Sequence, residues 1–159
     1  MQKETTFQGP YVGAAFLCEK VLMEAGNVPT FVRMVDRFTV PMFSQPIPPG
    51  FQLPPKIVQA QLVLLLRAGD IGAGRHTITI KLEKPDGSYG PDQSAPIFFQ
   101  GTGENGAMLQ VPIFIPTPEE GLYWFEIYFE QVTLLSRVPM RVLFQPAIFQ
   151  APMGPLSEE

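Results

Sequence analysis

The chain has 159 residues and a net charge of −4, and 45% of its residues are hydrophobic while only 16% are charged. This composition excludes a disordered chain, and the length suits one domain. With 14 glycines and 18 prolines, the chain is divided into short segments, which excludes long helices.

Extended strands are predicted along the first half of the chain. Residues 12–24 form the first expected strand, and a turn at 25–27 leads into a second strand at 30–40. Segment 41–55 holds six prolines in fifteen residues, so we expect a loop without regular structure. Residues 58–67 are apolar on both faces, which favours a central strand over the alternative, one helix of about ten residues.

The second half of the chain shows a period of two residues. Residues 75–84 alternate strictly, and shorter strands are expected at 97–100 and 108–115. Residues 121–130 and 136–144 read as a hairpin with its tip near 131–133. Because Pro139 has no amide donor, we expect the last strand to lie at a sheet edge or to carry a bulge.

These elements predict an all-β protein. About eight strands with apolar faces are buried most economically in a two-layer antiparallel β-sandwich, immunoglobulin-like in a loose sense. The predicted sandwich domain covers residues 1–144 and includes the proline-rich loop at 41–55. Residues 145–159 form a proline-rich C-terminal tail.

The basic residues are too scattered to form a phosphate-binding patch. The nearest approach is Arg33 with Arg37, and Asp36 stands between them. Nucleic-acid binding requires lysine and arginine side chains gathered on one surface. We therefore expect no nucleic acid among the partners.

The single cysteine and the uncharged stretches indicate where in the cell the protein is expected. Cys18 lies in an apolar run and is interpreted as a buried, inert thiol, so no oxidising compartment is required. The uncharged stretches 38–55 and 142–157 are broken by proline, so neither fits a membrane-spanning helix. We expect a cytoplasmic protein without a membrane span.

Residues that could carry chemistry are few. His76 is the only histidine, and it shares a strand face with Ile78 and Ile80, which favours a rim position over a catalytic base. Glu126 and Glu130 would stand roughly 13 Å apart on one strand face, beyond the range of a glycosidase pair. One cysteine and one histidine do not make a zinc site. We therefore expect no cofactor, no metal and no enzymatic activity.

The remaining candidates are surface side chains. Trp124, Tyr128 and Leu122 lie on the otherwise polar face of their strand, and aromatic rings there can stack on a sugar or anchor a partner. The alternative is that this strand is covered on both sides. Further apolar side chains lie in the proline-rich segments, at Phe43, Phe51, Ile148 and Phe149, and these would dock on their own chain or on a neighbour.

Two regions resemble a known family. Residues 16–22 (FLCEKVL), Gly26 and 31–38 (FVRMVDRF) are similar to the opening of a family of small uncharacterised bacterial β-sandwich proteins. Residues 121–127 (GLYWFEI) and 135–142 (LSRVPMRV) resemble the final hairpin of that family. The resemblance implies the immunoglobulin-like fold and a bacterial protein, and it carries no activity.

Two functions follow from these expectations. The first is a non-catalytic interaction or assembly module that self-associates or serves as a subunit of a larger bacterial complex, because charge is low and apolar irregular segments are available. The alternative is a carbohydrate- or small-ligand-binding module that uses Trp124 and Tyr128.

Overall fold

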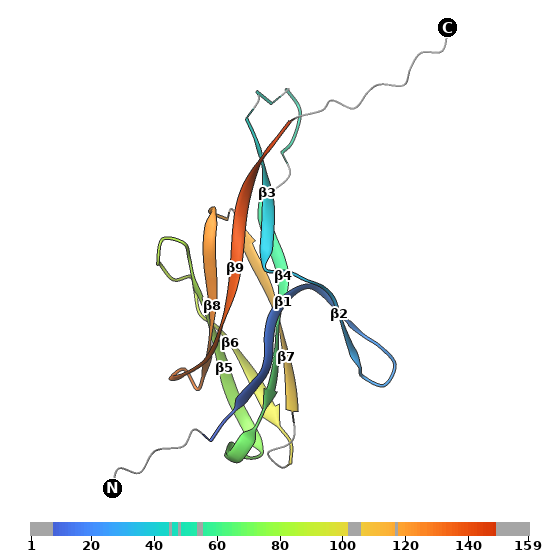
Figure 1. Ribbon diagram of the computed structural model, residues 1–159, viewed down its shortest axis with the longest axis vertical. Coiled ribbons are helices and arrows are strands. Elements are labelled where there is room, and N and C mark those ends of the chain that lie inside the picture. The colour runs from blue at the N-terminus through green and yellow to red at the C-terminus, as the bar shows by residue number, and fades with distance from the viewer. Residues whose placement is uncertain are drawn as a thin grey trace.

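The protein is all-β and consists of two sheets (Figure 1). The computed structural model describes residues 8–44, 46–47, 49–53, 56–101, 106–116 and 118–148. The strands are β1 (Tyr11–Met23), β2 (Pro29–Met34), β3 (Arg37–Phe43), β4 (Ile57–Arg67), β5 (Gly74–Glu83), β6 (Gln93–Phe99), β7 (Gly106–Pro116), β8 (Gly121–Phe129) and β9 (Thr133–Ala147), with a short 3-10 turn at Gly69–Ile71. The described residues thus hold nine strands, one more than predicted.

The strands are shared between a four-stranded and a five-stranded sheet. The first has the order β2-β1-β4-β7 and the second the order β3-β9-β8-β5-β6. Six of the pairings are antiparallel, but β3 runs parallel to β9. The prediction of a purely antiparallel sandwich is therefore wrong at this one pair.

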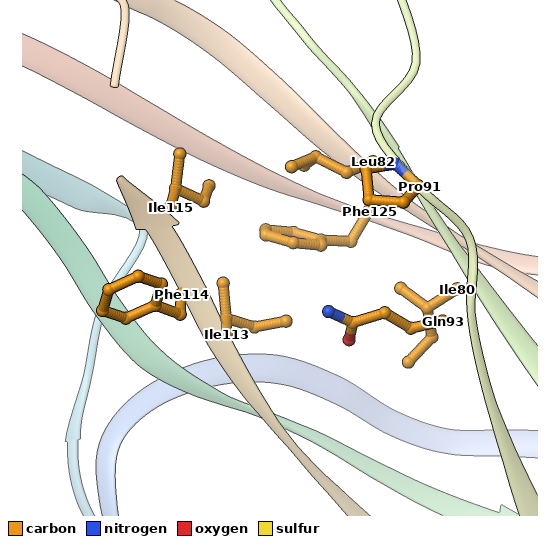
Figure 2. A pocket seen from close by; sticks show the side chains of 8 residues that line it. All are labelled: Ile80, Leu82, Pro91, Gln93, Ile113, Phe114, Ile115 and Phe125. Atoms are coloured by element: carbon orange, nitrogen blue, oxygen red, sulfur yellow. The ribbon is translucent and has the colours of Figure 1, made fainter. Parts of the chain in front are cut away.

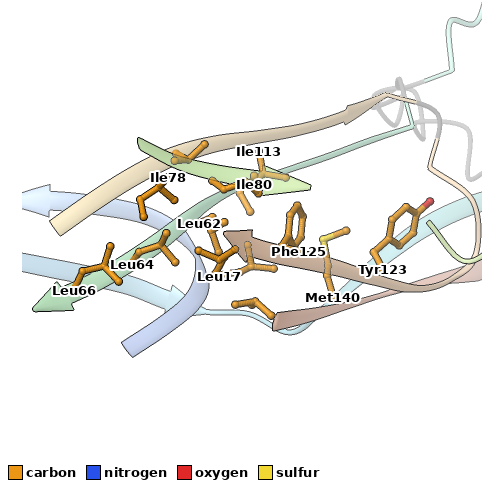
Figure 3. Close-up of a cluster of buried hydrophobic side chains, with 14 of the residues drawn as sticks. Leu17, Leu62, Leu64, Leu66, Ile78, Ile80, Ile113, Tyr123, Phe125 and Met140 are labelled. Carbon is orange, nitrogen blue, oxygen red and sulfur yellow. The ribbon is translucent and has the colours of Figure 1, made fainter. Parts of the chain in front are cut away.

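The hydrophobic core lies between the two sheets (Figure 3). Strand β4 contributes one complete face to it, and every second residue from Val58 to Leu66 is at most 1% exposed. Phe125, Ile127 and Met140 of the other sheet close the core from the opposite side. Burial of β4 between β1 and β7 confirms that residues 58–67 form a central strand rather than a helix.

The strand predicted at 30–40 is divided in two, because the chain leaves one sheet for the other. Strand β2 ends at Met34, next to Arg33, which has a positive φ of 54°. The Asp36 carbonyl then accepts a hydrogen bond from the Arg141 amide of β9 (2.8 Å), and β3 begins in the second sheet. The change of sheet coincides with a break in the alternation, where Met34 and Val35 are both apolar and Asp36 and Arg37 both charged, and the prediction of one strand overlooked this break.

The edges of the proline-rich segments are more ordered than predicted. Strand β3 continues to Phe43, into the segment predicted as an irregular loop, and β9 continues to Ala147, into the predicted tail. These two ends pair with each other in register, Pro41 with Gln145 and Phe43 with Ala147. Parallel pairing to a partner strand thus stabilises residues that lack a periodic pattern of their own.

Pro139 lies in a strand with partners on both sides, so the prediction of an edge strand is wrong for β9 as a whole. Pro139 pairs with Trp124 of β8, whereas β3 pairs with β9 only from Arg141 onward. At Pro139 one side of β9 therefore has no ladder, which is where a residue without an amide donor fits. Strand β9 does carry a bulge, the other predicted outcome, but at Leu135: Ile127 pairs with Ser136 and Tyr128 with Leu134, so Leu135 is the extra residue.

Among the residues that the structure describes, no helix is long and apolar enough to cross a membrane.

Candidate functional site

The two sheets present outer faces of opposite character. We call the outward-facing side of β4, of β7 and of residues 14–18 of β1 the uncharged face; beyond it the same side of β1 continues with the charged Lys20. The face consists of Ala14, Phe16, Cys18, Ile57, Gln59, Gln61, Val63, Leu65, Arg67, Gly106, Met108, Gln110, Pro112, Phe114 and Pro116. Within this set only Arg67, at one end of β4, is charged. The neighbouring residues in each strand point into the core, so strand alternation fixes which side chains belong to the face.

Large apolar side chains on the uncharged face reach solvent. Phe114 is 58% exposed and Met108 36%, while Val63 at the centre of the face is 0% exposed because it lies between its strand neighbours. Phe16 pairs with Val63 in the ladder and contacts Phe31 of β2 edge to face, with ring centroids 4.9 Å apart. The uncharged face is therefore apolar at its centre, and the Phe114 and Met108 side chains of β7 project from it into solvent.

The polar groups of the uncharged face are neutral amides. The Gln110 side-chain amide donates a hydrogen bond to the Gln61 side-chain oxygen (3.1 Å), across β7 and β4. Cys18 lies beside Gln61 in register and is fully buried, as predicted. Burial raises the pKa of the Cys18 thiol, so the neutral thiol dominates at neutral pH.

The outer side of the five-stranded sheet, which we call the charged face, carries a network centred on Glu126. Glu126 is 8% exposed although its strand face points outward. Its Oε1 pairs with the Arg137 Nε (3.1 Å), and its Oε2 accepts a hydrogen bond from the Tyr128 hydroxyl (3.0 Å) and a longer one from the Tyr89 hydroxyl (3.4 Å). Arg137 also pairs with Glu83 of β5. A carboxylate with this number of partners is stable at low exposure.

The same network raises the pKa values of two phenols. Hydrogen bonding to Glu126 raises the pKa of Tyr128, and desolvation adds to the shift. Desolvation is the larger cause for Tyr89, and the Glu126 charge adds to it. Both phenols therefore stay neutral donors to the carboxylate.

The predicted aromatic surface lies on the charged face, where cations cover it. The Arg137 guanidinium lies 4.6 Å from the Trp124 ring centroid, and the Lys81 ammonium lies 5.1 Å from that of Tyr128. Trp124, Tyr128 and Leu122 are half-buried. A sugar that stacked on the covered side of either ring would have to displace a cation, so this geometry gives the carbohydrate hypothesis little support.

The apolar residues predicted in the proline-rich segments do not gather into one site. Phe43 is half-buried and lines a hollow with Met42 and Phe144 at the end of the parallel pair. Phe51 is 42% exposed and Ile148 74% exposed. Phe149 lies outside the described residues.

His76 lies at the rim of the core, as predicted. Its Nδ1 is 3.1 Å from Glu130 Oε1, and its Nε2 is buried without a hydrogen-bond partner in the described part of the chain. The ring packs beside Phe129 and Phe99. Within the described residues, no group of three or more histidine, cysteine, aspartate or glutamate side chains is placed to hold a metal ion.

The sequence analysis did not identify the uncharged face. Its signal was present in β4, where Gln59, Gln61, Val63 and Leu65 alternate with the core residues and bring no charge. Because β4 is apolar on both sides, it was correctly predicted as a central strand. Its outer side, however, is covered by no other element of the two described sheets.

The comparisons with known proteins are sparse. No protein-family model and no curated protein matches this chain. Among solved structures, the chain resembles the alkylpurine DNA glycosylase AlkC of Pseudomonas fluorescens, bound to DNA with an abasic-site analogue, with a TM-score of 0.42 and 6% sequence identity. The likeness covers 81% of this chain and 30% of the glycosylase, so the chain spans less than a third of that protein.

One prediction is corrected by this comparison. We expected no enzymatic activity, whereas the matched glycosylase is an enzyme, and the expectation is therefore withdrawn. At this TM-score and identity the likeness carries no argument about which reaction, substrate or partner belongs to this chain.

Proposed function

We propose that the protein is an assembly module that self-associates through the uncharged face. The observation that carries the proposal is the set of outward-facing residues on β4, on β7 and on residues 14–18 of β1, of which only Arg67 is charged. Exposed apolar patches on soluble proteins mark interaction sites. A homo-oligomer of this kind would supply the repeated subunit of a larger bacterial complex.

Because it carries almost no charge, the uncharged face is suited to binding a second copy of the chain. In a two-fold symmetric interface the same surface meets itself, so every charge faces a like charge or a neighbour of the same set. The uncharged face avoids this repulsion, whereas the outer side of the other sheet carries Glu83, Glu126, Lys81 and Arg137. Neutral amides such as Gln61 and Gln110 can also exchange hydrogen bonds with identical amides.

The size of the face also fits a dimer. Strands β4 and β7 are each 11 residues long. Three strands at about 4.8 Å spacing and about 3.4 Å per residue give a projected area of roughly 500 Å². Side-chain relief increases the accessible area above the projected one, towards the ~800 Å² per partner of a standard interface.

Sedimentation of two matched variants tests the proposal. Phe114, 58% exposed on the uncharged face, and Phe98, 59% exposed on β6 of the other sheet, are equivalent in size and exposure. We expect Phe114→Asp to shift the protein to monomer and Phe98→Asp to leave the oligomer intact. A monomeric wild type at high concentration, or equal effects of both variants, would contradict the proposal.

Salt dependence provides a second readout. Association through an uncharged face changes little between low and high sodium chloride, whereas contacts through Arg137, Glu83 and Lys81 would weaken as salt screens them. A dissociation constant that rises more than about tenfold over this range would assign the interface to charged groups instead.

The proposal includes an immunoglobulin-like fold. The order of β1, β4 and β7 in one sheet and of β9, β8 and β5 in the other is that of strands A-B-E and G-F-C of such domains. The Tyr123 hydroxyl accepts a hydrogen bond from the Glu119 amide (2.8 Å) and donates one to its carbonyl (3.1 Å), as in a tyrosine corner. The chain departs from disulfide-linked members, since Cys18 is its single cysteine. A cytoplasmic location accords with that cysteine.

A further inference from the structure

A small apolar cavity opens between the two sheets, on the side where their edge strands β6 and β7 lie. Its volume is about 90 Å³, and Ile80, Leu82 and Phe125 line it from the five-stranded sheet. Ile113 and Ile115 line it from β7 (Figure 2). Phe114 of the uncharged face also lines the cavity, so the cavity and the uncharged face adjoin at this residue.

The volume limits what the cavity can take. An apolar cavity of ~150 Å³ accommodates benzene, and each water in the liquid occupies ~30 Å³. A cavity of about 90 Å³ is therefore filled by a branched group of four carbon atoms. Isoleucine, leucine and phenylalanine make up most of the wall and give water no hydrogen-bond partners, while Gln93 supplies a polar group, so an apolar group attached to a polar one is favoured there.

One polar group is directed into the cavity. The exposed Gln93, at the start of β6, turns its side-chain amide toward Ile113 (Figure 2). The described residues include no hydrogen-bond partner for this amide. A primary amide offers one acceptor and two donors side by side, which is the complement of a peptide group.

The adjoining edge strand is compatible with the same ligand. Within the described sheets β6 pairs with β5 alone, so one side of its backbone is open. An extended peptide that adds to such an edge places alternate side chains towards the sheet interface. The cavity lies at that interface, beside the first residues of β6.

We propose that this cavity binds the branched aliphatic side chain of an extended peptide, that of leucine, isoleucine or valine, and that the Gln93 amide binds the attached peptide group. The ligand is a segment of another protein, and its site adjoins the uncharged face at Phe114. The module would therefore hold its client beside the surface that binds copies of itself.

Methyl NMR with N-acetyl-leucine amide tests the proposal on the full chain. We expect saturable shifts of the methyl groups of Ile80, Leu82, Ile113 and Ile115, at millimolar ligand. N-acetyl-alanine amide should bind at least about tenfold more weakly because it leaves the cavity unfilled. N-acetyl-tryptophan amide exceeds the volume and should give no saturable shift at these methyls.

A substitution at the amide separates the two parts of the site. Gln93→Leu should weaken the binding of N-acetyl-leucine amide about fivefold. The binding of isobutanol, which has the branched alkyl group but no peptide group, should stay unchanged. Gln59→Leu, an exposed glutamine on the uncharged face, is the matched control and should change neither. Equal affinity for the leucine and alanine amides, shifts elsewhere on the protein, or none up to about 50 mM ligand would overturn the proposal.

Discussion

The outer faces of the two sheets differ in whether their side chains have partners within the fold. On the charged face Glu126, Arg137 and Tyr128 bind one another, and Arg137 and Lys81 cover the aromatic rings. On the uncharged face Phe114 and Met108 remain exposed, and the polar groups are neutral amides. Aromatic residues on the outer face of a sheet therefore do not by themselves mark a binding surface. A face that already pairs its own groups needs no partner, whereas one that leaves apolar groups in water gains by association.

The largest effect is expected at the centre of the charged face. Arg137→Leu should lower the free energy of unfolding by about 2 kcal/mol, because it leaves the buried Glu126 carboxylate without its cation. The double variant with Glu126→Leu should recover most of this loss. Urea denaturation of the four proteins measures the coupling. A single-variant loss below about 0.5 kcal/mol would mean that the network is a solvated surface pair.

The corresponding pair on the uncharged face should behave in the opposite way. Replacing Gln61 and Gln110 together by leucine removes both hydrogen-bond partners, so the free energy of unfolding should change by less than about 0.5 kcal/mol. Association should become tighter by severalfold because apolar area is added. Sedimentation equilibrium checks this, and weaker association would show that the amides themselves hold the interface.

Alkaline pH sharpens the comparison further. The pKa values of Tyr128 and Tyr89 are raised in the fold, so their contribution to stability is fully present below about pH 10 and is lost as the pH rises through the folded-state values. Tyr128→Phe should therefore make stability less dependent on pH in this range. Thermal denaturation between about pH 9 and 11 measures it, and an unchanged pH slope would contradict the assignment.

The smallest effect is expected at Cys18. Its buried thiol has a raised pKa, so thiolate is scarce and alkylation of the native protein by iodoacetamide at neutral pH should be far slower than after unfolding. Mass spectrometry of both states provides the rates. A native rate close to the unfolded one would place Cys18 in a mobile or open part of β1.

Strand positions were predictable because one side of each strand faces the core. The alternation in β5, β8 and β4 sets strand type and inward residues alike, and the structure confirms these elements. The division between β2 and β3 was marked only by a short break in the alternation, at Met34-Val35 and Asp36-Arg37, and the prediction of one strand overlooked it. The parallel pairing of β3 with β9 is a long-range contact, to which the local pattern at 41–43 and 145–147 holds no clue.

The candidate sites were less predictable than the fold. Trp124 and Tyr128 were recognised as outward-facing, but the cations above them come from β9 and β5 and depend on register. The cavity beside Gln93 is lined by residues of both sheets, so the sequence of no single segment predicts it.

Oxidation footprinting across protein concentration tests the self-association surface most directly. Met108 reports on the uncharged face, Trp124 on the charged face, and Met23, 55% exposed at the end of β1, serves as an internal reference. We expect hydroxyl-radical oxidation of Met108 to fall as the protein is concentrated, while Trp124 and Met23 keep their rates. Protection of Trp124 with unchanged oxidation of Met108 would contradict the account and move the interface to the other sheet.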